Sequence, residues 1–470
     1  MSGRQRMYQS FLYLATIAFG QGLSFLVLPI VTRLLPPEVY GQYALALTVS
    51  NLLAMLASSW IRNVSLRLYY DAVKREQTLG FYLGTAALQV LTFTVLYASS
   101  LVLFHLVGFE IAPLRVMISA GVAIVLGDQF AYAVILIRAQ QRTGSFAVAE
   151  IGSGAIRFSA TVLALTMGFR SPEVLFDAAS LGYLLGAAYA VPTLMRRLTG
   201  VARLDLAGAL EVVRYGPRSL PFSVSGWFER MADRLVIEHF IGTAAVGVYS
   251  IGYALGERLI GGLVQGVFMM AWPSVLNAWN ERGVDGARDA LVEAQRLFAW
   301  FTVGPVFFLV VYGTALTEAL TGAEYHSAAI VVPIVAVSIW LGGFGSYLNR
   351  HLELEKRFGT LSLVTAVGAA VNVGLNIVLV PRLGLLGAAI ATLVNRVLNT
   401  SVYFVMRNRS LTRINVTTFR NAALLAGGAY ATASILPVGD IFAMATFVGL
   451  YGVGAVWTLL RSRTASATDR

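Results

Sequence analysis

The sequence contains no cysteine and only four histidines. The absence of cysteine excludes disulfide bonds and thiolate metal ligands. The histidines (His105, His239, His326 and His351) are far apart in the chain, and none has a partner at metal-ligand spacing. The GxxxxGK[ST] loop that binds nucleotide phosphates is also missing, which argues against ATP hydrolysis by this chain. No catalytic set is evident, and we expect a protein that is not an enzyme.

Charged residues are scarce as well. They make up 13% of the 470 residues, whereas an ordinary soluble domain carries about 25%. The mean hydropathy is +0.71, and no hydrophilic segment is long enough to form a separate soluble domain. This composition predicts an integral membrane protein.

Apolar runs close to the length that crosses a ~30 Å hydrocarbon core as a helix recur along the chain. We therefore predict an all-α membrane protein with 14 transmembrane helices. They span residues 10–33, 42–61, 80–104, 114–137, 146–168, 174–195, 217–241, 246–271, 295–317, 327–348, 359–380, 384–406, 419–437 and 441–460.

The net charge of +11 is distributed unevenly between the two sides of this predicted topology. Most of the 35 lysines and arginines fall on the side that holds both termini, and only Arg33, Arg115, Arg170 and Arg382 fall on the other. Cytosolic loops carry the excess of basic residues, so both termini are predicted to be cytosolic. The basic excess is thus a topology signal, and we expect no nucleic-acid partner.

An internal repeat is indicated by two similar stretches. TRLLPPEVYGQYALAL (Thr32–Leu47) is followed by a fainter copy, EHFIGTAAVGVYSIGYAL (Glu238–Leu255), in which Gly247 matches Gly41. An even number of predicted spans separates the copies, so two six-helix units would run in the same direction, related by a pseudo-twofold axis along the membrane normal. We predict an N-terminal lobe over 1–200, a C-terminal lobe over 201–406, and two peripheral helices with a cytosolic tail over 407–470. The connector Leu198–Val213 alternates charges with leucines and is a candidate interfacial helix.

Four charges, at Glu229, Arg230, Asp233 and Arg234, lie well inside the predicted span 217–241. At 100° per residue they share a sector of about 140° with small and polar residues, while Leu220, Trp227, Phe228 and Leu235 lie outside it. Charges at bilayer depth persist where they face protein or a water-filled cavity. We predict that this face lines a cavity.

Four motifs resemble the O-antigen-type polysaccharide flippases of the multidrug/oligosaccharidyl-lipid/polysaccharide (MOP) superfamily. Thr32–Leu45 is similar to the first-loop motif, with Pro36 where the family usually has glycine. Arg214–Pro217 resembles the Tyr-Gly-x-Pro entry to the second lobe, although the proline is shifted. Leu320–Tyr325 and Pro381–Ala391 resemble the loops between helices nine and ten and between helices eleven and twelve. Together the motifs span about residues 1–410.

The resemblance implies two six-helix bundles around a central cavity, in the bacterial inner membrane. It also implies transport of an undecaprenyl-pyrophosphate-linked oligosaccharide from the cytosolic to the periplasmic leaflet. A glycan polymerase and other assembly proteins are candidate partners, and we expect a monomer.

Pyrophosphate is bound well by guanidinium groups, which donate two parallel hydrogen bonds to phosphate oxygens. Sugars call for amides, hydroxyls and flat stacking faces. The candidate headgroup ligands are Arg62, Arg157, Arg230, Arg234, Arg258 and Arg396. The candidate polar residues of the cavity are Gln21, Asn51, Glu229, Tyr249, Tyr253, Glu257, Asn395 and Asn399.

The alternative is that these charges pair with one another and are structural. Five acids that we expect to be buried match in number five arginines inside the spans: Arg157, Arg230, Arg234, Arg258 and Arg396. Glu150 and Arg157 share one helix face, and Asp128 in the preceding helix is a second candidate partner for Arg157. The acids are Asp128, Glu150, Glu229, Asp233 and Glu257.

A second group of residues suggests an ion site. Asn372 and Asn376 lie one turn apart, and with Thr392 and Asp233 they offer the hard oxygen ligands that suit Na⁺ better than a transition metal. Some superfamily members are similarly thought to bind a cation between helices seven, eleven and twelve, where Asn376 would here replace an acid. Coupling to Na⁺ or H⁺ is a candidate driving force, and no other cofactor is expected. The alternative is that both asparagines bond between helices.

Three rival functions remain open at this point. A drug/cation antiporter of the same superfamily would have a less basic cavity and usually twelve helices. A flippase for the peptidoglycan lipid precursor would share the pyrophosphate headgroup. A membrane glycan polymerase or ligase would carry a large periplasmic catalytic loop, whereas the longest predicted loops here are cytosolic.

Overall fold

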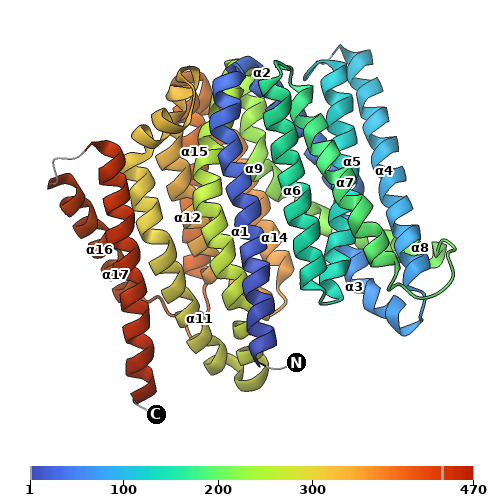
Figure 1. The fold of residues 1–470 in the computed structure, drawn as a ribbon. Coiled ribbons are helices and arrows are strands. Elements are labelled where there is room, and N and C mark those ends of the chain that lie inside the picture. The colour runs from blue at the N-terminus through green and yellow to red at the C-terminus, as the bar shows by residue number, and fades with distance from the viewer. Residues whose placement is uncertain (1–2, 109, 436–438, 469–470) are drawn as a thin grey trace. The chain divides into compact units, whose positions relative to one another are not determined.

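The computed structural model describes residues 3–108, 110–435 and 439–468, and these residues are helices joined by short connections (Figure 1). Contacts divide the chain into two compact units, Met1–Ser250 and Ile251–Arg470. The predicted all-α fold class is confirmed. The unit boundary lies later in the chain than the predicted lobe boundary at residue 200, because α8, α9 and most of α10 pack with the first unit.

Over its described residues, the first unit contains nine α-helices and the start of a tenth. They are α1 (Gly3–Leu34), α2 (Pro37–Ala54), α3 (Trp60–Lys74), α4 (Thr78–Val107), α5 (Leu114–Ala139), α6 (Thr143–Thr166), α7 (Glu173–Met195), α8 (Leu206–Tyr215), α9 (Leu220–Phe240) and α10 (Thr243–Gly256). A π-helical segment, η1 (Met55–Ser59), joins α2 to α3, and a 3₁₀ turn, η2 (Gly216–Ser219), leads from α8 into α9.

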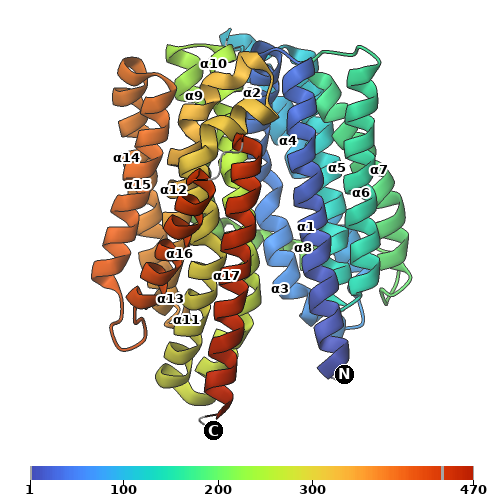
Figure 2. The ribbon, with the colours of Figure 1, turned by 60° about the vertical axis from the view of Figure 1, so that its left-hand side comes forward.

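The second unit is built on one long helical segment, α11. Its helices are α11 (Gly262–Leu320), α12 (Val331–Leu348), α13 (Arg350–Leu354), α14 (Phe358–Leu383), α15 (Leu385–Met406), α16 (Val416–Ile435) and α17 (Asp440–Thr468), preceded by the π-helical η3 (Glu257–Gly261) and with the 3₁₀ segment η4 (Ala323–Ile330) before α12. Gly283, with φ 61° and ψ −140°, interrupts α11 between the two predicted spans it contains. The C-terminal pair packs on α11 through both α16 and α17, and the Tyr451 hydroxyl of α17 donates to the Trp300 carbonyl oxygen of α11 at 2.8 Å (Figure 2).

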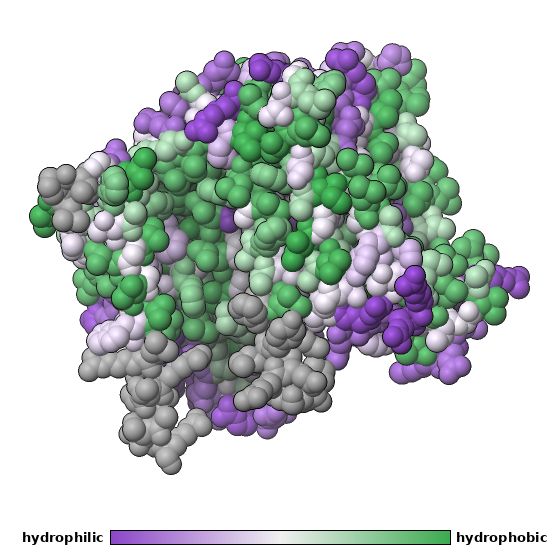
Figure 3. All heavy atoms as spheres, in the orientation of Figure 1, coloured by the Kyte–Doolittle hydropathy of each residue, from purple (hydrophilic) through white to green (hydrophobic). Residues whose placement is uncertain are grey.

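Ten described helical segments are long and apolar enough to cross a membrane, and Ala18–Leu34 forms a shorter apolar helix. Each predicted span lies on helix to within a few residues, and the end of the span 419–437 falls on residues 436–438, outside the described residues. Because α9 carries too many charges to qualify as a simple apolar span, it is not among the ten. The count of fourteen spans stays a prediction. Hydrophobic side chains cover much of the surface in Figure 3, as lipid-facing helices require.

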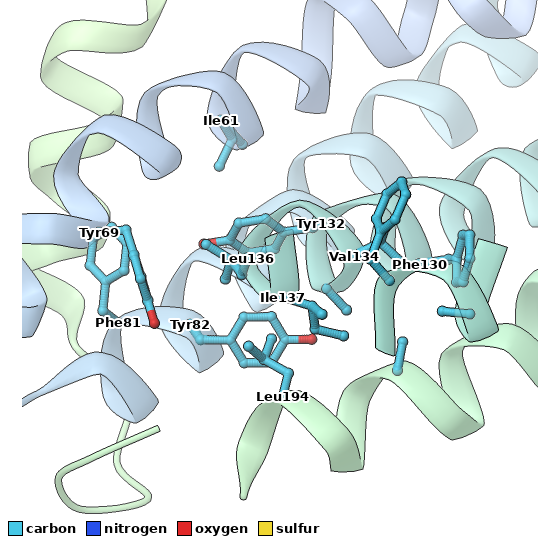
Figure 4. Close-up of a cluster of buried hydrophobic side chains, with 14 of the residues drawn as sticks. Ile61, Tyr69, Phe81, Tyr82, Phe130, Tyr132, Val134, Leu136, Ile137 and Leu194 are labelled. Carbon is cyan, nitrogen blue, oxygen red and sulfur yellow. The ribbon is translucent and has the colours of Figure 1, made fainter. Parts of the chain in front are cut away.

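One core cluster of the first unit joins α3, α4, α5, α6, α7 and α8. Figure 4 shows the cluster, in which Ile61, Phe81, Tyr132, Leu136 and Leu194 are buried. The buried phenol of Tyr132 is hydrogen-bonded to Thr85 at 2.7 Å, which satisfies its one polar group. This packing fixes α3 and α5 side by side, and that arrangement brings together charged residues of the site described below.

The two stretches predicted as repeats lie against each other. A Cβ on Gly41 of α2 would lie 2.0 Å from the carbonyl oxygen of Thr243, and a Cβ on Gly247 of α10 would lie 2.1 Å from that of Pro37. The contact is reciprocal, since each glycine meets the residue at the start of the other helix. Such an arrangement is the form that a local twofold relation takes. Glycine is required at both positions because no side chain fits.

Candidate substrate-binding site

The charged face of α9 turns toward the protein. Glu229, Asp233 and Arg234 are buried, while Phe222 and Phe228 on the same helix are exposed. Buried carboxylates and guanidinium groups are stable only with partners, and the structure supplies them around Asp233.

Asp233 holds a compact network in the first unit. Its Oδ1 accepts from the Arg234 guanidinium at 3.1 Å and from the Arg234 backbone N–H at 2.9 Å. Its Oδ2 accepts from the Tyr249 hydroxyl at 2.6 Å. Arg234 also donates to the carbonyl oxygen of Arg230 at 3.0 Å, and its guanidinium lies 5.9 Å from the Tyr249 ring centroid. The network links α9 to α10, and the Arg234 guanidinium is the ion-pair partner of the Asp233 carboxylate.

Arg230 differs from its neighbour one turn away. Its side chain is exposed, and no carboxylate of the described residues lies within ion-pair distance of it. The guanidinium lies back along α9, where a Cβ on Gly226 would be 3.1 Å from its Nη1. Arg230 therefore has donors that can bind an anion from outside the protein.

Arg62 is paired with Asp128. Its Nη1 donates to Asp128 Oδ1 at 2.9 Å, and the side chains are 24% and 16% exposed. The Ser58 hydroxyl of η1 donates to Asp128 Oδ2 at 2.5 Å. The expectation that Asp128 neutralises Arg157 is wrong, because packing of α3 beside α5 gives that carboxylate to Arg62.

Arg157, on α6, is held by α7 instead. It donates to the Tyr183 hydroxyl at 3.0 Å, and its guanidinium carbon lies 4.8 Å from the Tyr183 ring centroid. A Cβ on Gly182 would lie 2.2 Å from Arg157 Cγ, so this glycine makes room for the side chain. The Nε of Arg157 is buried and has no hydrogen-bond partner. A phenol and a ring satisfy the cation only in part, which leaves it able to attract an anion.

The remaining polar candidates of the first unit differ in exposure. Gln21 is exposed, Asn51 is half-buried, and Glu150 is half-buried on α6. In the second unit Glu257 is exposed, which corrects its expected place among the buried acids, and Arg258 and Arg396 are half-buried.

Helix α15 of the second unit places Asn395, Arg396 and Asn399 within one turn. Asn395 is fully buried, and Asn399 lies so close to α14 that a Cβ on Gly368 would be 2.5 Å from its amide nitrogen. A Cβ on Gly342 of α12 would lie 3.4 Å from Arg396 Nε, so Arg396 packs along α12. Tyr253, on α10, is buried.

The predicted ion ligands belong to both units, with Asp233 in the first and the other three in the second. Asn376 donates from Nδ2 to the carbonyl oxygen of Asn372 at 2.9 Å and approaches its Oδ1 at 3.3 Å. The Oδ1 of Asn376 is buried without a hydrogen-bond partner, while Thr392 donates to the Ala388 carbonyl oxygen at 3.1 Å. An orphaned amide oxygen fits a cation, but both oxygens of Asp233 are already occupied within the first unit. Among the described residues no group of three or more His, Cys, Asp or Glu could hold a metal ion.

A charged cluster that the sequence did not indicate lies in the second unit at Arg350, beyond the end of α12. Arg350 is 9% exposed and is paired with Glu353, and its guanidinium carbon lies 3.8 Å from the Phe268 ring centroid and 4.4 Å from that of Trp272. Burial lowers the pKa of Arg350, and the Glu353 carboxylate opposes that shift. Two sequence signals could have pointed to it: the one-turn spacing of Phe268 and Trp272, and the i, i+3 spacing of Arg350 and Glu353.

Comparison with solved structures defines the class of the fold. The lipid II flippase MurJ in an inward closed conformation matches 97% of this chain and 100% of its own with a TM-score of 0.74, at 11% identity. An inward-facing multidrug resistance MATE transporter of the MOP superfamily matches 84% of this chain and 94% of its own with a TM-score of 0.57, at 15% identity. The chain is a multi-span membrane protein with the fold of the MOP transporters.

Sequence comparison shows the family. The model of the polysaccharide biosynthesis protein family matches residues 7–273, and the chain belongs to that family. The probable low-salt glycan biosynthesis flippase Agl15 of Haloferax volcanii is 23% identical over 93% of this chain and 89% of its own length. The succinoglycan biosynthesis transport protein ExoT of Rhizobium meliloti is 22% identical over 69% of this chain and 66% of its own. These relatives are named as flippases or transport proteins, not enzymes, and the resemblance to the MOP flippases is confirmed.

Proposed function

We propose that this protein moves an oligosaccharide linked to polyprenyl pyrophosphate from the cytosolic to the periplasmic leaflet of the inner membrane. In bacteria the polyprenyl carrier would be undecaprenyl. The lipid tail stays in the bilayer while the headgroup and sugars cross through the protein by alternating access. Both termini are cytosolic in this proposal, and the protein works as a monomer alongside glycan polymerase and other assembly proteins.

One observation carries the proposal. Arg230 is exposed and has no acid partner among the described residues, although its neighbours Asp233 and Arg234 on the charged face of α9 are buried. An arginine left unpaired in a membrane protein is costly unless it serves a ligand or a water-filled path. Pyrophosphate supplies the matching charge, and bidentate donation to its oxygens is what a guanidinium does best.

The other arginines divide between binding and support. Arg157, Arg258 and Arg396 add positive charge for the headgroup, while Arg62 and Arg234 hold Asp128 and Asp233 in place. Gln21, Asn51, Tyr253, Asn395 and Asn399 serve the sugars. A coupling cation, Na⁺ or H⁺, supplies the driving force, with the Asn376 amide oxygen as a Na⁺ ligand.

The test is a translocation assay in vesicles that contain the purified protein. Three labelled cargoes are compared: a polyprenyl-pyrophosphate oligosaccharide, the peptidoglycan lipid precursor, and a lipophilic cation. We expect fast translocation of the first and slow translocation of the other two. Preferential transport of the peptidoglycan precursor or of the cation would replace the proposal by one of those functions.

A further inference from the structure

The chain between the spanning helices α7 and α9 is fixed to the end of α4. The Leu79 backbone N–H donates to the Thr199 carbonyl oxygen at 2.9 Å, and the Asp205 N–H donates to the Gly80 carbonyl oxygen at 3.0 Å. A Cβ on Gly80 would lie 2.5 Å from the Arg203 carbonyl oxygen, so the connector runs directly against the first turn of α4. Since α4 is long and apolar enough to cross a membrane, these bonds hold the connector against one end of a candidate membrane span.

Helix α8 begins at this anchor. The Asp205 carboxylate accepts from the Gly208 N–H at 2.9 Å and caps the helix. One face of α8 is buried, with Ala209 and Val212 packed against the unit and Gly208 beside Phe81.

The opposite face has no partner within the described residues. Leu206 is 67% exposed, Leu210 68% and Val213 38%, and the i, i+4, i+7 spacing places them on one stripe. Two more apolar side chains, Val201 and Leu204, are exposed in the connector just before the helix. Figure 3 shows hydrophobic surface in this region next to hydrophilic residues.

One exposed arginine lies beside the stripe on α8, and two more lie in the chain just before and just after the helix. Arg214 lies about 40° from Leu210 around the helix, Arg203 precedes the helix, and Arg218 follows it. Of the two acids in the connector and on α8, Asp205 caps the helix, and Glu211 is half-buried about 100° from Leu210 around the helix. A leucine stripe edged by arginines is the pattern of a helix lying in the membrane interface, with charge complementary to anionic headgroups.

We propose that the exposed face of α8 lies on the membrane surface and binds anionic phospholipid. The leucines enter the boundary between headgroups and acyl chains, and the arginines bind lipid phosphates. The connector between α7 and α9 thereby fixes the position of α9, the helix that carries Arg230, relative to the bilayer surface. This inference depends on the membrane topology of α4 and not on the identity of the transported lipid.

The absence of native cysteine allows a single spin label to report on this face without background. The full-length protein with Leu210→Cys, labelled with a nitroxide, is placed in nanodiscs of phosphatidylcholine with or without phosphatidylglycerol. Collision with oxygen reports lipid contact, and collision with a water-soluble nickel complex reports water contact. Asp285→Cys, at a side chain that is 79% exposed on a charged turn, is the water-accessible reference.

We expect the label at 210 to contact lipid, and its lipid-contacting fraction to be larger in the phosphatidylglycerol discs. Each arginine removed, in Arg203→Gln, Arg214→Gln and Arg218→Gln, is expected to lower the ratio of lipid-contacting to water-contacting label about fivefold. Leu206→Cys serves as an independent second reporter. A label at 210 as accessible to water as the reference would overturn the proposal and favour a protein partner for this face. Equal lipid contact in both disc types would overturn the anionic preference.

Discussion

The clearest separation of binding from stability is expected between Arg230 and Arg234, which lie one turn apart on α9. Arg234→Ala leaves the Asp233 carboxylate, 3% exposed, with only the Tyr249 hydroxyl and a backbone N–H as donors. Removing one member of a buried ion pair costs about 3–5 kcal/mol of unfolding free energy. Arg230→Ala removes an exposed side chain with no ion pair among the described residues, and such changes stay within about 0.5 kcal/mol.

The effect on binding should be reversed. A hydrogen bond to a charged group contributes about 1.5–3 kcal/mol, so Arg230→Ala should weaken binding of a polyprenyl-pyrophosphate oligosaccharide about 10- to 150-fold. Arg230→Lys should recover part of that loss, because the charge remains while the bidentate geometry is lost. Thermal unfolding in detergent and a titration with the lipid-linked glycan are the two assays. Unchanged affinity in Arg230→Ala, or an Arg234→Ala protein as stable as the wild type, would refute this reasoning.

Three further predictions follow from contacts within each unit. Asp128→Asn should lower the free energy of unfolding by about 1–3 kcal/mol, because it leaves the Arg62 guanidinium without its counter-charge. The Arg62→Gln, Asp128→Asn double variant tests the pair: if its loss of stability equalled the sum of the two single losses, the two residues would not be coupled. Gly41→Ala should lower the free energy of unfolding by about 1–3 kcal/mol, because its Cβ would clash with the Thr243 carbonyl oxygen. Gly22→Ala is the control: nothing lies within 4 Å of its Cβ, so this variant should be as stable as the wild type or slightly more so. Equal stability of the two variants would contradict the close contact at Gly41. Asn376→Asp should strengthen Na⁺ binding, because it adds negative charge where the Asn376 amide oxygen has no hydrogen-bond partner. The measurement is the rise in melting temperature with added Na⁺. If Na⁺ changed the melting temperature of neither the wild type nor the variant, the proposed ion site would be refuted.

The helices could be predicted from the sequence because their cause is local. A run of about twenty apolar residues must satisfy its own backbone hydrogen bonds in a membrane, and a helix does so. The Pro36–Pro37 pair ends one helix and opens the next, as its fixed φ and missing N–H require. The similarity of the two stretches matched Gly41 with Gly247, but the sequence did not predict that the two stretches contact each other.

Partners across helices could not be predicted in the same way. Periodicity places Arg157 and Asp128 on helix faces, but which helices are neighbours, and at what height, depends on packing around residues such as Tyr132. In the structure Asp128 forms an ion pair with Arg62, and Arg157 donates a hydrogen bond to Tyr183. The aromatic surroundings of Arg350 depend on α11 passing beside the end of α12, which no local pattern encodes.

The central claim is that Arg230, an exposed arginine on α9, binds the anionic headgroup of a lipid-linked glycan. Its most direct test is the rate at which a labelled polyprenyl-pyrophosphate oligosaccharide crosses vesicles that contain equal amounts of wild-type or Arg230→Ala protein. The account predicts rapid crossing with the wild type and a rate near that of protein-free vesicles with the variant. Equal rates for the two proteins would contradict it.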